Sequence, residues 1–488
     1  MSLYYLDSSN HRQARQRSEK VREGEWLMVS KRIYSDDLKM PLKQQVASAI
    51  IKIIGHAYPE LVISHRSAFE YRIHDDCIYV TGSRSRKRDI HGIKIVEVPG
   101  PKFIPEYDQQ IMGAHISGTE RMLLENLEVS RGLHKSLGQT WVEEWLETTL
   151  GRLGENELNR IRGQARVITE YGGWDKEFKK LDSIIGSLLG SHKGHLISKL
   201  AAARSHGDPY DKQRVELFSG LASYIKRCQF IYRRPQSDDL IAHENAAFWD
   251  AYFSNYIEGT RFPVVEAEDI IFNRNVNESM HEDSHNIMRS FDILSDRVEM
   301  NILPKSADDL LDILVMRHRY FMDESPEKKP GEFKAVNNVA GNTIFVEPDR
   351  VEGTLSRAFH YYSLLDCAVA KAMYIMFVIA EVHPFIDGNG RMARKMMNAE
   401  LISAGLERIL IPTCFRDDYL LGLRSVTRNN NYNSYCRMLD RAHHFTATFN
   451  YLKLEETTKT FEKLGVFEEG KFARLPELAY RKNMSVFP

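Results

Sequence analysis

The stretch that decides the fold of the C-terminal half is His383-Pro384-Phe385-Ile386-Asp387-Gly388-Asn389-Gly390-Arg391-Met392-Ala393-Arg394. It follows residues 366–382, which are apolar almost all round, and such a segment is typical of a helix buried in the middle of a bundle. Pro384 disfavours the helical region for the residue before it, so the helix is expected to end at His383. A second helix is predicted from Arg391 to about Ala404, ended by Gly405.

The residue types of the loop suit chemistry at a phosphate group. Gly388, Asn389 and Gly390 allow a tight backbone whose amides converge at a helix N-terminus, an arrangement that favours an anion. Arg391 and Arg394 are three residues apart, so both lie on one face of the second helix and can reach neighbouring phosphates.

Two further loop residues have a candidate role. Asp387 supplies a hard oxygen ligand for a magnesium ion that bridges phosphate oxygens. The His383 imidazole can take a proton from an attacking hydroxyl near neutral pH. A histidine before proline is often only a helix terminator, and Gly-Asn-Gly is often only a turn, but the joint pattern indicates a functional site.

The string resembles the active-site signature of the Fic family, His-Pro-Phe-x-(Asp/Glu)-Gly-Asn-Gly-Arg-x-x-Arg, at every specified position, and the resemblance covers roughly residues 240–450. It implies an all-helical core that transfers AMP from ATP, the co-substrate, to a Ser, Thr or Tyr of a target protein, with Mg²⁺ as the cofactor. The complete Gly-Asn-Gly-Arg loop favours nucleotidyl transfer over the kinase activity of the related death-on-curing toxins.

The resemblance also implies a role for each loop residue. His383 is the general base and Asp387 the metal ligand. The segment Gly388, Asn389 and Gly390 forms the phosphate cradle. The residues that bind or orient the nucleotide phosphates are Asn389, Arg391 and Arg394.

Residues 333–348 fall where the Fic family places its flap, a hairpin that binds the target through strand-to-strand hydrogen bonds. Strand-like alternation around a Gly-Asn pair is a hairpin signal. An ordinary surface hairpin explains the pattern equally well. The contact edge that we expect consists of Val339, Ala340, Gly341, Asn342, Thr343, Ile344 and Phe345.

The segment Ser254-Asn255-Tyr256-Ile257-Glu258-Gly259 matches the inhibitory motif of the Fic family, Ser/Thr-x-x-x-Glu-Gly/Asn. It lies upstream of the core, on a helix predicted near residues 247–259 and ended by Gly259, as in the Fic class with an N-terminal inhibitory helix. Pairing of Glu258 with Arg394 would make the guanidinium unavailable to the γ-phosphate of ATP. Ser254 is the first residue of the same inhibitory motif. In some relatives this glutamate supports removal of AMP, so a reverse activity is also open. The alternative is a glutamate on a solvated helical face.

The first 135 residues differ in sequence pattern from the helical C-terminal half, because they contain short runs of β-branched residues between residues 73 and 98. Residues 55–131 contain Val62–Ala68, Ile78–Gly82 and Gly113–Ser117. This part, with a possible extension to residues 209–211, loosely resembles the AbiE-type antitoxin and transcriptional-regulator family, whose members carry a winged helix that residues 10–36 could represent in reduced form. The basic turn Ser83–Arg88 could contact a DNA backbone, or be a solvated loop. Ser64 and His65 have no Gly-x-Ser-x-Gly elbow nearby, so we assign them a structural role.

We therefore predict a mainly α fold, with a Fic helical core and hairpin flap preceded by an α+β region. The expected domains are an α+β regulator-like domain (1–135), a helical extension and linker (136–235), the catalytic domain (236–452) and a C-terminal tail (453–488). The alternative function is a DNA-binding antitoxin fused to a silenced Fic toxin, in the manner of a toxin–antitoxin pair.

Composition limits the class of protein. The 66 basic and 67 acidic residues give a net charge near −1, which argues against binding to polyanions over the whole surface. Five scattered cysteines indicate reduced thiols. The sequence contains no apolar run long enough to span a membrane, so we expect a cytoplasmic location. The expected partners are the target protein and the chain itself through auto-modification. DNA contact and a homodimer remain open.

Overall fold

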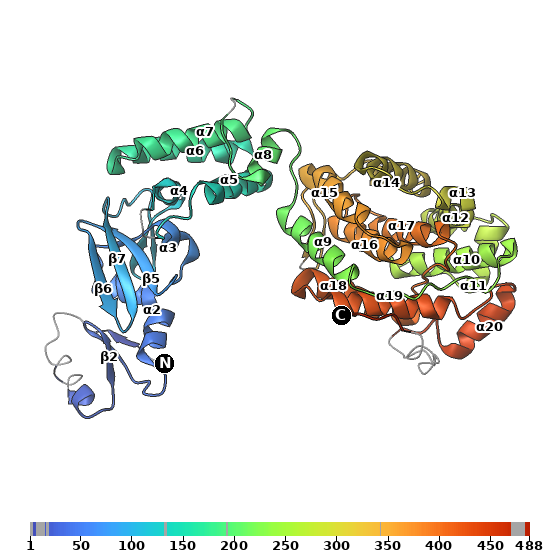
Figure 1. Ribbon diagram of the computed structural model, residues 1–488, viewed down its shortest axis with the longest axis horizontal. Helices are drawn as coiled ribbons and strands as arrows, with labels where there is room; N and C mark the ends of the chain where they lie inside the picture. Colours follow the sequence, from blue (N-terminus) through green and yellow to red (C-terminus); the bar gives the residue numbers. More distant parts are fainter. Residues whose placement is uncertain are drawn as a thin grey trace. The chain divides into compact units, whose positions relative to one another are not determined.

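The computed structural model describes residues 3–5, 15, 19–130, 134–191, 194–341, 343–469 and 484–488. They form two compact units, Met1–Gly207 and Asp208–Pro488, coloured blue to green and green to red in Figure 1. The division falls within the range 136–235 that the sequence analysis assigns to an extension and linker. Each unit has its own hydrophobic core.

The first unit combines helices with a mixed β-sheet. In the described part of the unit, the larger sheet has the order β6-β7-β5-β4-β9-β8, with β5 parallel to β7, β4 parallel to β9 and the other pairs antiparallel. A smaller antiparallel sheet has the order β1-β3-β2. The strands are β1 (Leu3–Tyr5), β2 (Leu27–Ser30), β3 (Ile33–Ser35), β4 (Val62–Ile63), β5 (Cys77–Gly82), β6 (Arg86–Ile90), β7 (Ile93–Pro99), β8 (Gln109–Ile111) and β9 (Ala114–Ile116).

Helix α2 packs against β7 and β9 of the larger sheet. Its side chains Val46, Ile50 and Ile54 are buried, while Ile51 is half-buried. The helices of this unit are α2 (Leu42–Ala57), α3 (His65–Glu70), α4 (Thr119–Leu127), α5 (Gln139–Leu153), α6 (Glu155–Gly172), α7 (Asp175–Leu188) and α8 (Lys199–Ser205).

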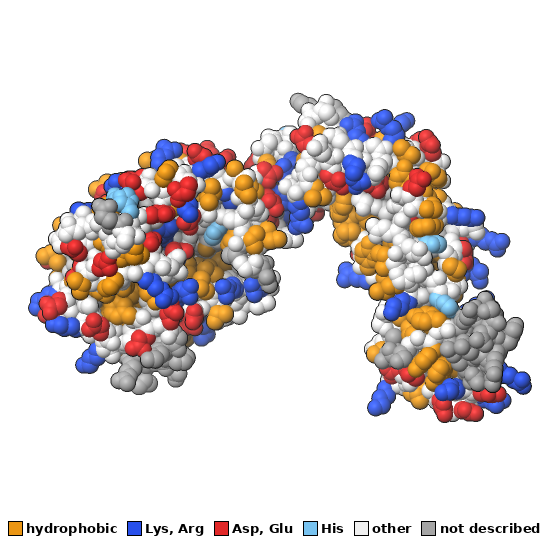
Figure 2. Space-filling model, turned by 180° about the vertical axis from the view of Figure 1, so that it is seen from behind, with side chains coloured by type: hydrophobic (Ala, Val, Ile, Leu, Met, Phe, Trp, Pro, Cys, Tyr) orange, Lys and Arg blue, Asp and Glu red, His pale blue; other side chains and the backbone are white. Residues whose placement is uncertain are grey.

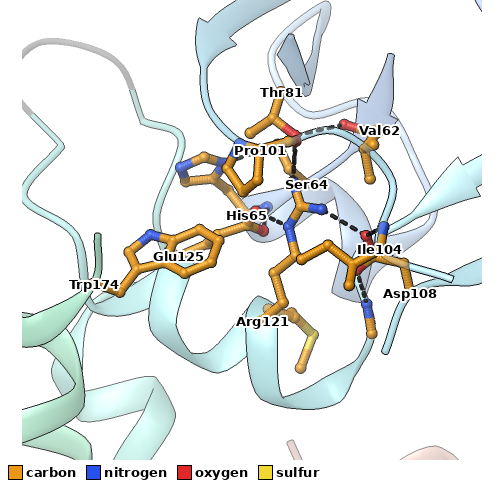
Figure 3. Close-up of polar contacts among 12 residues, drawn as sticks. Val62, Ser64, His65, Thr81, Pro101, Ile104, Asp108, Arg121, Glu125 and Trp174 are labelled. Carbon is orange, nitrogen blue, oxygen red and sulfur yellow. Dashed lines mark hydrogen bonds and ion pairs between the residues drawn. The ribbon is translucent and has the colours of Figure 1, made fainter. Parts of the chain in front are cut away.

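A buried guanidinium, that of Arg121, lies at the centre of a polar network in this unit (Figure 3). It donates hydrogen bonds to Asp108 at 2.6 Å, Glu125 at 2.8 Å and the Thr81 hydroxyl at 2.6 Å. Two carboxylates around one guanidinium compensate the cost of burying its charge. The network therefore ties helix α4 to strand β5.

Ser64 and His65 are buried beside this network (Figure 3). The Ser64 hydroxyl lies 2.9 Å from Nδ1 of His65, whose backbone N–H donates to Glu125 at 2.9 Å. Nε2 of His65 pairs with Glu128 at 3.1 Å. These contacts join the start of α3 to the end of α4, which supports the structural role assigned to both residues.

In its described residues, the second unit is helical apart from a small hairpin, so the predicted mainly α fold is confirmed. Its hairpin strands are β10 (Val339–Ala340) and β11 (Thr343–Ile344). Its α-helices are α9 (Lys212–Ile225), α10 (Leu240–Ile257), α11 (Val264–Phe272), α12 (His281–Ser295), α13 (Arg297–Met300), α14 (Ala307–Phe321), α15 (Val351–Ser363), α16 (Ala368–Val382), α17 (Asn389–Ser403), α18 (Arg416–Asn429), α19 (Tyr432–Thr446) and α20 (Leu454–Leu464). The 3₁₀ turns are η1 (Glu278–Met280), η2 (Pro326–Lys328), η3 (Pro348–Arg350) and η4 (Thr413–Phe415).

Helix α16 runs through the centre of this bundle, packed against α9, α15 and α17 (Figure 1). Nearly all of its side chains are buried, as its apolar sequence predicts. Helix α20 also joins the core, because Phe461 is completely buried, and Phe487 near the chain end is buried in the same core, so the described residues of the expected tail contribute to this unit's packing. In the described ranges, no helix is long and apolar enough to cross a membrane.

Candidate active site

The candidate site is built on the turn between α16 and α17. The chain leaves α16 at His383, which has a left-handed backbone with φ 54° and ψ 59°. Gly388 precedes α17 with φ 73°, and a Cβ there would lie 2.9 Å from the Phe321 ring. This position therefore requires glycine both for its backbone conformation and for its space.

The side chain of Asn389 closes this turn. Its Oδ1 accepts the Phe385 N–H at 2.8 Å, and its Nδ2 donates to the Phe385 carbonyl at 2.8 Å. The family resemblance implies that Asn389 binds or orients phosphates. In this structure its amide group holds the backbone of the loop, which prepares the adjacent N–H groups for an anion.

The His383 imidazole is held in one orientation. Nδ1 lies 3.3 Å from the Ala380 carbonyl, so Nδ1 carries the proton and Nε2 keeps its lone pair. The ring stacks on Phe345 with a centroid separation of 3.8 Å and an interplanar angle of 9°. Burial lowers the pKa of His383 to about 4, so the ring is neutral at pH 7 and able to accept a proton.

Phe345 belongs to the predicted flap, residues 333–348, whose strands β10 and β11 pair Val339 with Ile344 and Ala340 with Thr343. The structure thus places one end of the flap on His383. The Gly341 backbone has φ 58°, as a tight hairpin turn requires. Asn342 lies outside the described residues.

The other end of the flap is fastened to the loop by Lys334 and Asn338. The Lys334 N–H donates to the Pro384 carbonyl at 2.9 Å, and its buried ammonium group donates to Asn338 at 2.8 Å. Asn338 in turn donates to the Phe385 carbonyl at 2.9 Å. Burial lowers the pKa of Lys334 to about 8. The flap and the loop are therefore one connected polar structure.

Asp387 and Arg391 lie together at the loop. The Asp387 carboxylate accepts the Gly388 N–H at 2.7 Å and lies 3.6 Å from the Arg391 guanidinium. Arg391 also donates to the Asn255 side chain of α10 at 3.4 Å. Asp387 is 47% exposed, so its carboxylate is accessible to a ligand, whereas Arg391 is buried.

Arg394 is held entirely by protein groups. Its guanidinium donates to Glu258 at 2.6 Å, to the Ser254 hydroxyl at 2.9 Å and to the Ser254 carbonyl at 2.8 Å. The Tyr419 hydroxyl lies 3.3 Å away. Arg394 is 3% exposed and Glu258 34% exposed, so the pair joins a buried cation to an anion at the surface of the site.

Glu258 lies at the C-terminal end of α10, followed by Gly259 with φ 107°. A Cβ added to Gly390 would overlap its carboxylate oxygen and lie 3.1 Å from its Cδ. The carboxylate therefore rests on the first turn of α17, where the helix dipole favours an anion. A phosphate group approaching this turn would meet Glu258 at the same place.

The comparisons with known proteins match the part of the chain that contains the loop. The model of the Fic/DOC family matches residues 308–401. This part of the chain belongs to the Fic/DOC family. The Fic match covers α14, the flap, α16, the loop and most of α17, so it contains His383, Asp387, Arg391 and Arg394. Glu258 lies N-terminal to it.

Individual relatives match a longer part of the chain than the family model does. Protein adenylyltransferase Fic of Drosophila grimshawi is 26% identical over 182 residues, which cover 36% of this chain and 38% of that protein. The protein of the same name from Drosophila persimilis is 28% identical over 184 residues, with 36% of each chain covered. A solved structure of Fic-1 from C. elegans aligns over 68% of this chain and 96% of that chain, with 17% identity and a TM-score of 0.37.

The chain thus matches a little over a third of the length of these curated relatives. On the face shown in Figure 2, basic and acidic side chains are intermixed over the surface of the Fic-containing unit, in keeping with the balanced charge of the chain.

Several residues of the Fic site are not evident from the sequence. Lys334 and Asn338 lie inside the flap range but match no motif, and Tyr419 lies on α18, outside the family match. A lysine in an otherwise apolar and amide-rich hairpin is the only signal that could have pointed to Lys334. No feature of the sequence indicates that Tyr419 lies beside Arg394.

Proposed function

We propose that this protein is an autoinhibited protein adenylyltransferase that transfers AMP from ATP to a Ser, Thr or Tyr hydroxyl of a target protein. The observation that carries the proposal is the loop at His383, which joins a neutral imidazole to a helix N-terminus suited to phosphate. The names of the relatives support the same reaction class.

In the proposed reaction, Nε2 of His383 takes the proton of the target hydroxyl. The hydroxyl oxygen forms a bond to the α-phosphorus of ATP, and the bond from that phosphorus to the oxygen bridging to the β-phosphate breaks. Pyrophosphate leaves with the bridging oxygen, and AMP stays on the target. The lowered pKa of His383, about 4, supports the role of base because the ring is unprotonated at pH 7.

The backbone N–H groups at the start of α17 and the Arg391 guanidinium would hold the phosphates, since fixed donors aimed at developing charge lower the barrier. The single accessible carboxylate of Asp387 fits Mg²⁺, which is commonly held by one or two carboxylates together with substrate phosphates. The described ranges contain no group of three or more His, Cys, Asp or Glu side chains that could hold a metal. Bound Mg²⁺ would neutralise phosphate charge.

The inhibition rests on the ion pair between Glu258 and Arg394. Because the Arg394 guanidinium lies 2.6 Å from the Glu258 carboxylate, it is not available to bind the γ-phosphate. The Glu258 carboxylate also adds negative charge where a phosphate would bind, so ATP is disfavoured in its productive position. Opening of this pair is therefore the proposed step that activates the enzyme.

The proposal includes modification of the chain itself and a cytoplasmic location. The location rests on the five scattered cysteines, which form no pair typical of a disulfide framework or a zinc site. A reverse, AMP-removing activity of the same site remains part of the proposal, because Glu258 lies beside the loop on which the AMP would be held.

The test uses the full chain, a cell lysate as the source of acceptors, and α-labelled ATP. Glu258→Gly is expected to label itself and lysate proteins far more strongly than the wild type, and His383→Ala in the same background abolishes the label. Glu258→Gln, which keeps an acceptor but loses the charge, should lie between. Equal labelling by the wild type and Glu258→Gly would refute the brake, and labelling that survives His383→Ala would refute the catalytic assignment.

A further inference from the structure

The flap is too small to hold its own shape. Its strands β10 and β11 are two residues each, and an isolated two-stranded hairpin is at best marginally stable in water. Lys334 and Asn338 fasten one end to the loop, and Phe345 rests on His383 at the other. The outer edge of β11 needs a further support.

That support comes from Arg214 on helix α9. Its guanidinium donates to the Ile344 carbonyl of β11 at 2.9 Å and lies 2.7 Å from the Glu381 carboxylate of α16. The exposed fractions are 17% for Arg214 and 6% for Glu381. Glu381 also accepts the Thr427 hydroxyl of α18 at 2.7 Å. One side chain thus links the flap to the helix that ends at His383.

The hydrogen-bond pattern of the hairpin explains why this carbonyl is available. The Phe345 N–H donates to the Asn338 carbonyl at 3.4 Å, so residues 338 and 345 form a hydrogen-bonded pair. Such pairs alternate with non-hydrogen-bonded pairs in antiparallel strands, so Val339 and Ile344 form a pair of the second kind. The Ile344 carbonyl therefore faces away from β10, toward the outer edge where Arg214 lies.

Arg214 is itself well fixed. Its backbone N–H donates to the capping side chain of Asp211 at 3.0 Å, and the Asp211 N–H donates to Thr354 of α15 at 2.9 Å. An ion pair of 2.9 Å between Asp208 and Arg357 fastens the same segment to α15. A rigid helix end thus presents the guanidinium to the flap, which a mobile surface side chain could not do.

We propose that Arg214 is a positioning residue that fixes β11 to α16, so that the flap holds a target segment in register with His383. The inference rests on the proposed function for its catalytic meaning. Arg214 acts through the Ile344 carbonyl and the Glu381 carboxylate. Strand addition depends on backbone groups held in place, so loss of Arg214 affects the protein acceptor and not ATP.

The first test measures hydrogen–deuterium exchange of the flap in the full chain, without nucleotide. Arg214→Ala is expected to speed exchange of residues 336–345 about tenfold, because a hydrogen bond from a charged donor is lost. Arg214→Lys should restore part of the protection. Glu381→Gln should leave the protection of the flap amides near that of the wild type, since the hydrogen bond from Arg214 to the Ile344 carbonyl remains. Arg357→Ala, which removes an ion pair of the same segment but keeps the bond from Arg214 to Ile344, is the matched control and should raise flap exchange much less.

Unchanged flap exchange in Arg214→Ala, or an equal increase in Arg357→Ala, would overturn the proposal. The second test adds Arg214→Ala to Glu258→Gly, with ATP and the full-length His383→Ala chain as acceptor. The KM for the acceptor should rise about tenfold, with the KM for ATP unchanged. A parallel loss for both would refute positioning. If Glu258→Gly itself transfers no label, the proposed function fails, while the exchange result still decides the role of Arg214.

Discussion

Replacing Gly390 by alanine tests where the Glu258 carboxylate lies, and it needs no nucleotide. Gly390 lies in the first turn of α17, and its φ is not in the left-handed region. The added Cβ would overlap Oε1 of Glu258, with the Arg394 guanidinium 3.2 Å away. The end of the Glu258 side chain is flexible and partly exposed, so it can swing out and leave Arg394 without its carboxylate.

Two effects of opposite sign set the magnitude. Losing a hydrogen bond between charged groups costs about 2 kcal/mol of unfolding free energy, and glycine to alanine in a helix contributes about 1 kcal/mol in the other direction. Gly390→Ala should therefore destabilise the wild type by about 1 kcal/mol and stabilise Glu258→Gly by about 1 kcal/mol, a coupling of about 2 kcal/mol between Gly390 and Glu258.

The assay is urea unfolding of the four chains of this cycle, followed by pulse proteolysis so that the two units are scored separately. Gly422→Ala on α18 is the control, because a Cβ there has its nearest atom at 3.5 Å, an ordinary contact. It should change the unfolding free energy equally in both backgrounds. If Gly390→Ala also has equal effects in the two, Glu258 does not lie over Gly390, and the reasoning is refuted.

Three further predictions concern activity with α-labelled ATP. Because the pKa of His383 is lowered to about 4, transfer by Glu258→Gly should lose its base only as the pH falls toward 4; a pH–rate profile with a midpoint near 6.5 would contradict this. Lys334→Ala should lower transfer in the Glu258→Gly background at least about tenfold, since one buried charged hydrogen-bond donor is lost, with ATP affinity by calorimetry unchanged; weaker ATP binding would place Lys334 on the nucleotide. Ser254→Ala removes one hydrogen bond to Arg394, so its labelling should lie between the wild type and Glu258→Gly, and labelling at the wild-type level would show that Ser254 adds nothing to the brake.

The sequence predicted the parts of the site that depend on local signals. A continuous apolar run followed by His383 and Pro384 placed the end of α16 correctly, at Val382. The glycines of the loop placed the start of α17 within two residues of its observed start at Asn389. Both predictions work because helix ends are set by the few residues around them.

Contacts between distant elements could not be read from the sequence. Lys334 and Arg214 look like ordinary surface cations there, and only the tertiary fold brings them to the loop and to Ile344. The order of the six-stranded sheet is a similar case, because the β-branched runs predict strands but not that β5 runs parallel to β7. Asn389 shows a third limit, since the motif gives the residue but not that its amide binds the Phe385 backbone.

The most direct measurement of the central claim compares two labels on one enzyme. Glu258→Gly, incubated with cell lysate and ATP labelled either at the α- or at the γ-phosphate, should transfer the α-label to protein and not the γ-label, because AMP is retained and pyrophosphate leaves. The wild type should transfer little of either label. Transfer of the γ-label by Glu258→Gly, or of neither label, would contradict an adenylyltransferase held inactive by the pair of Glu258 and Arg394.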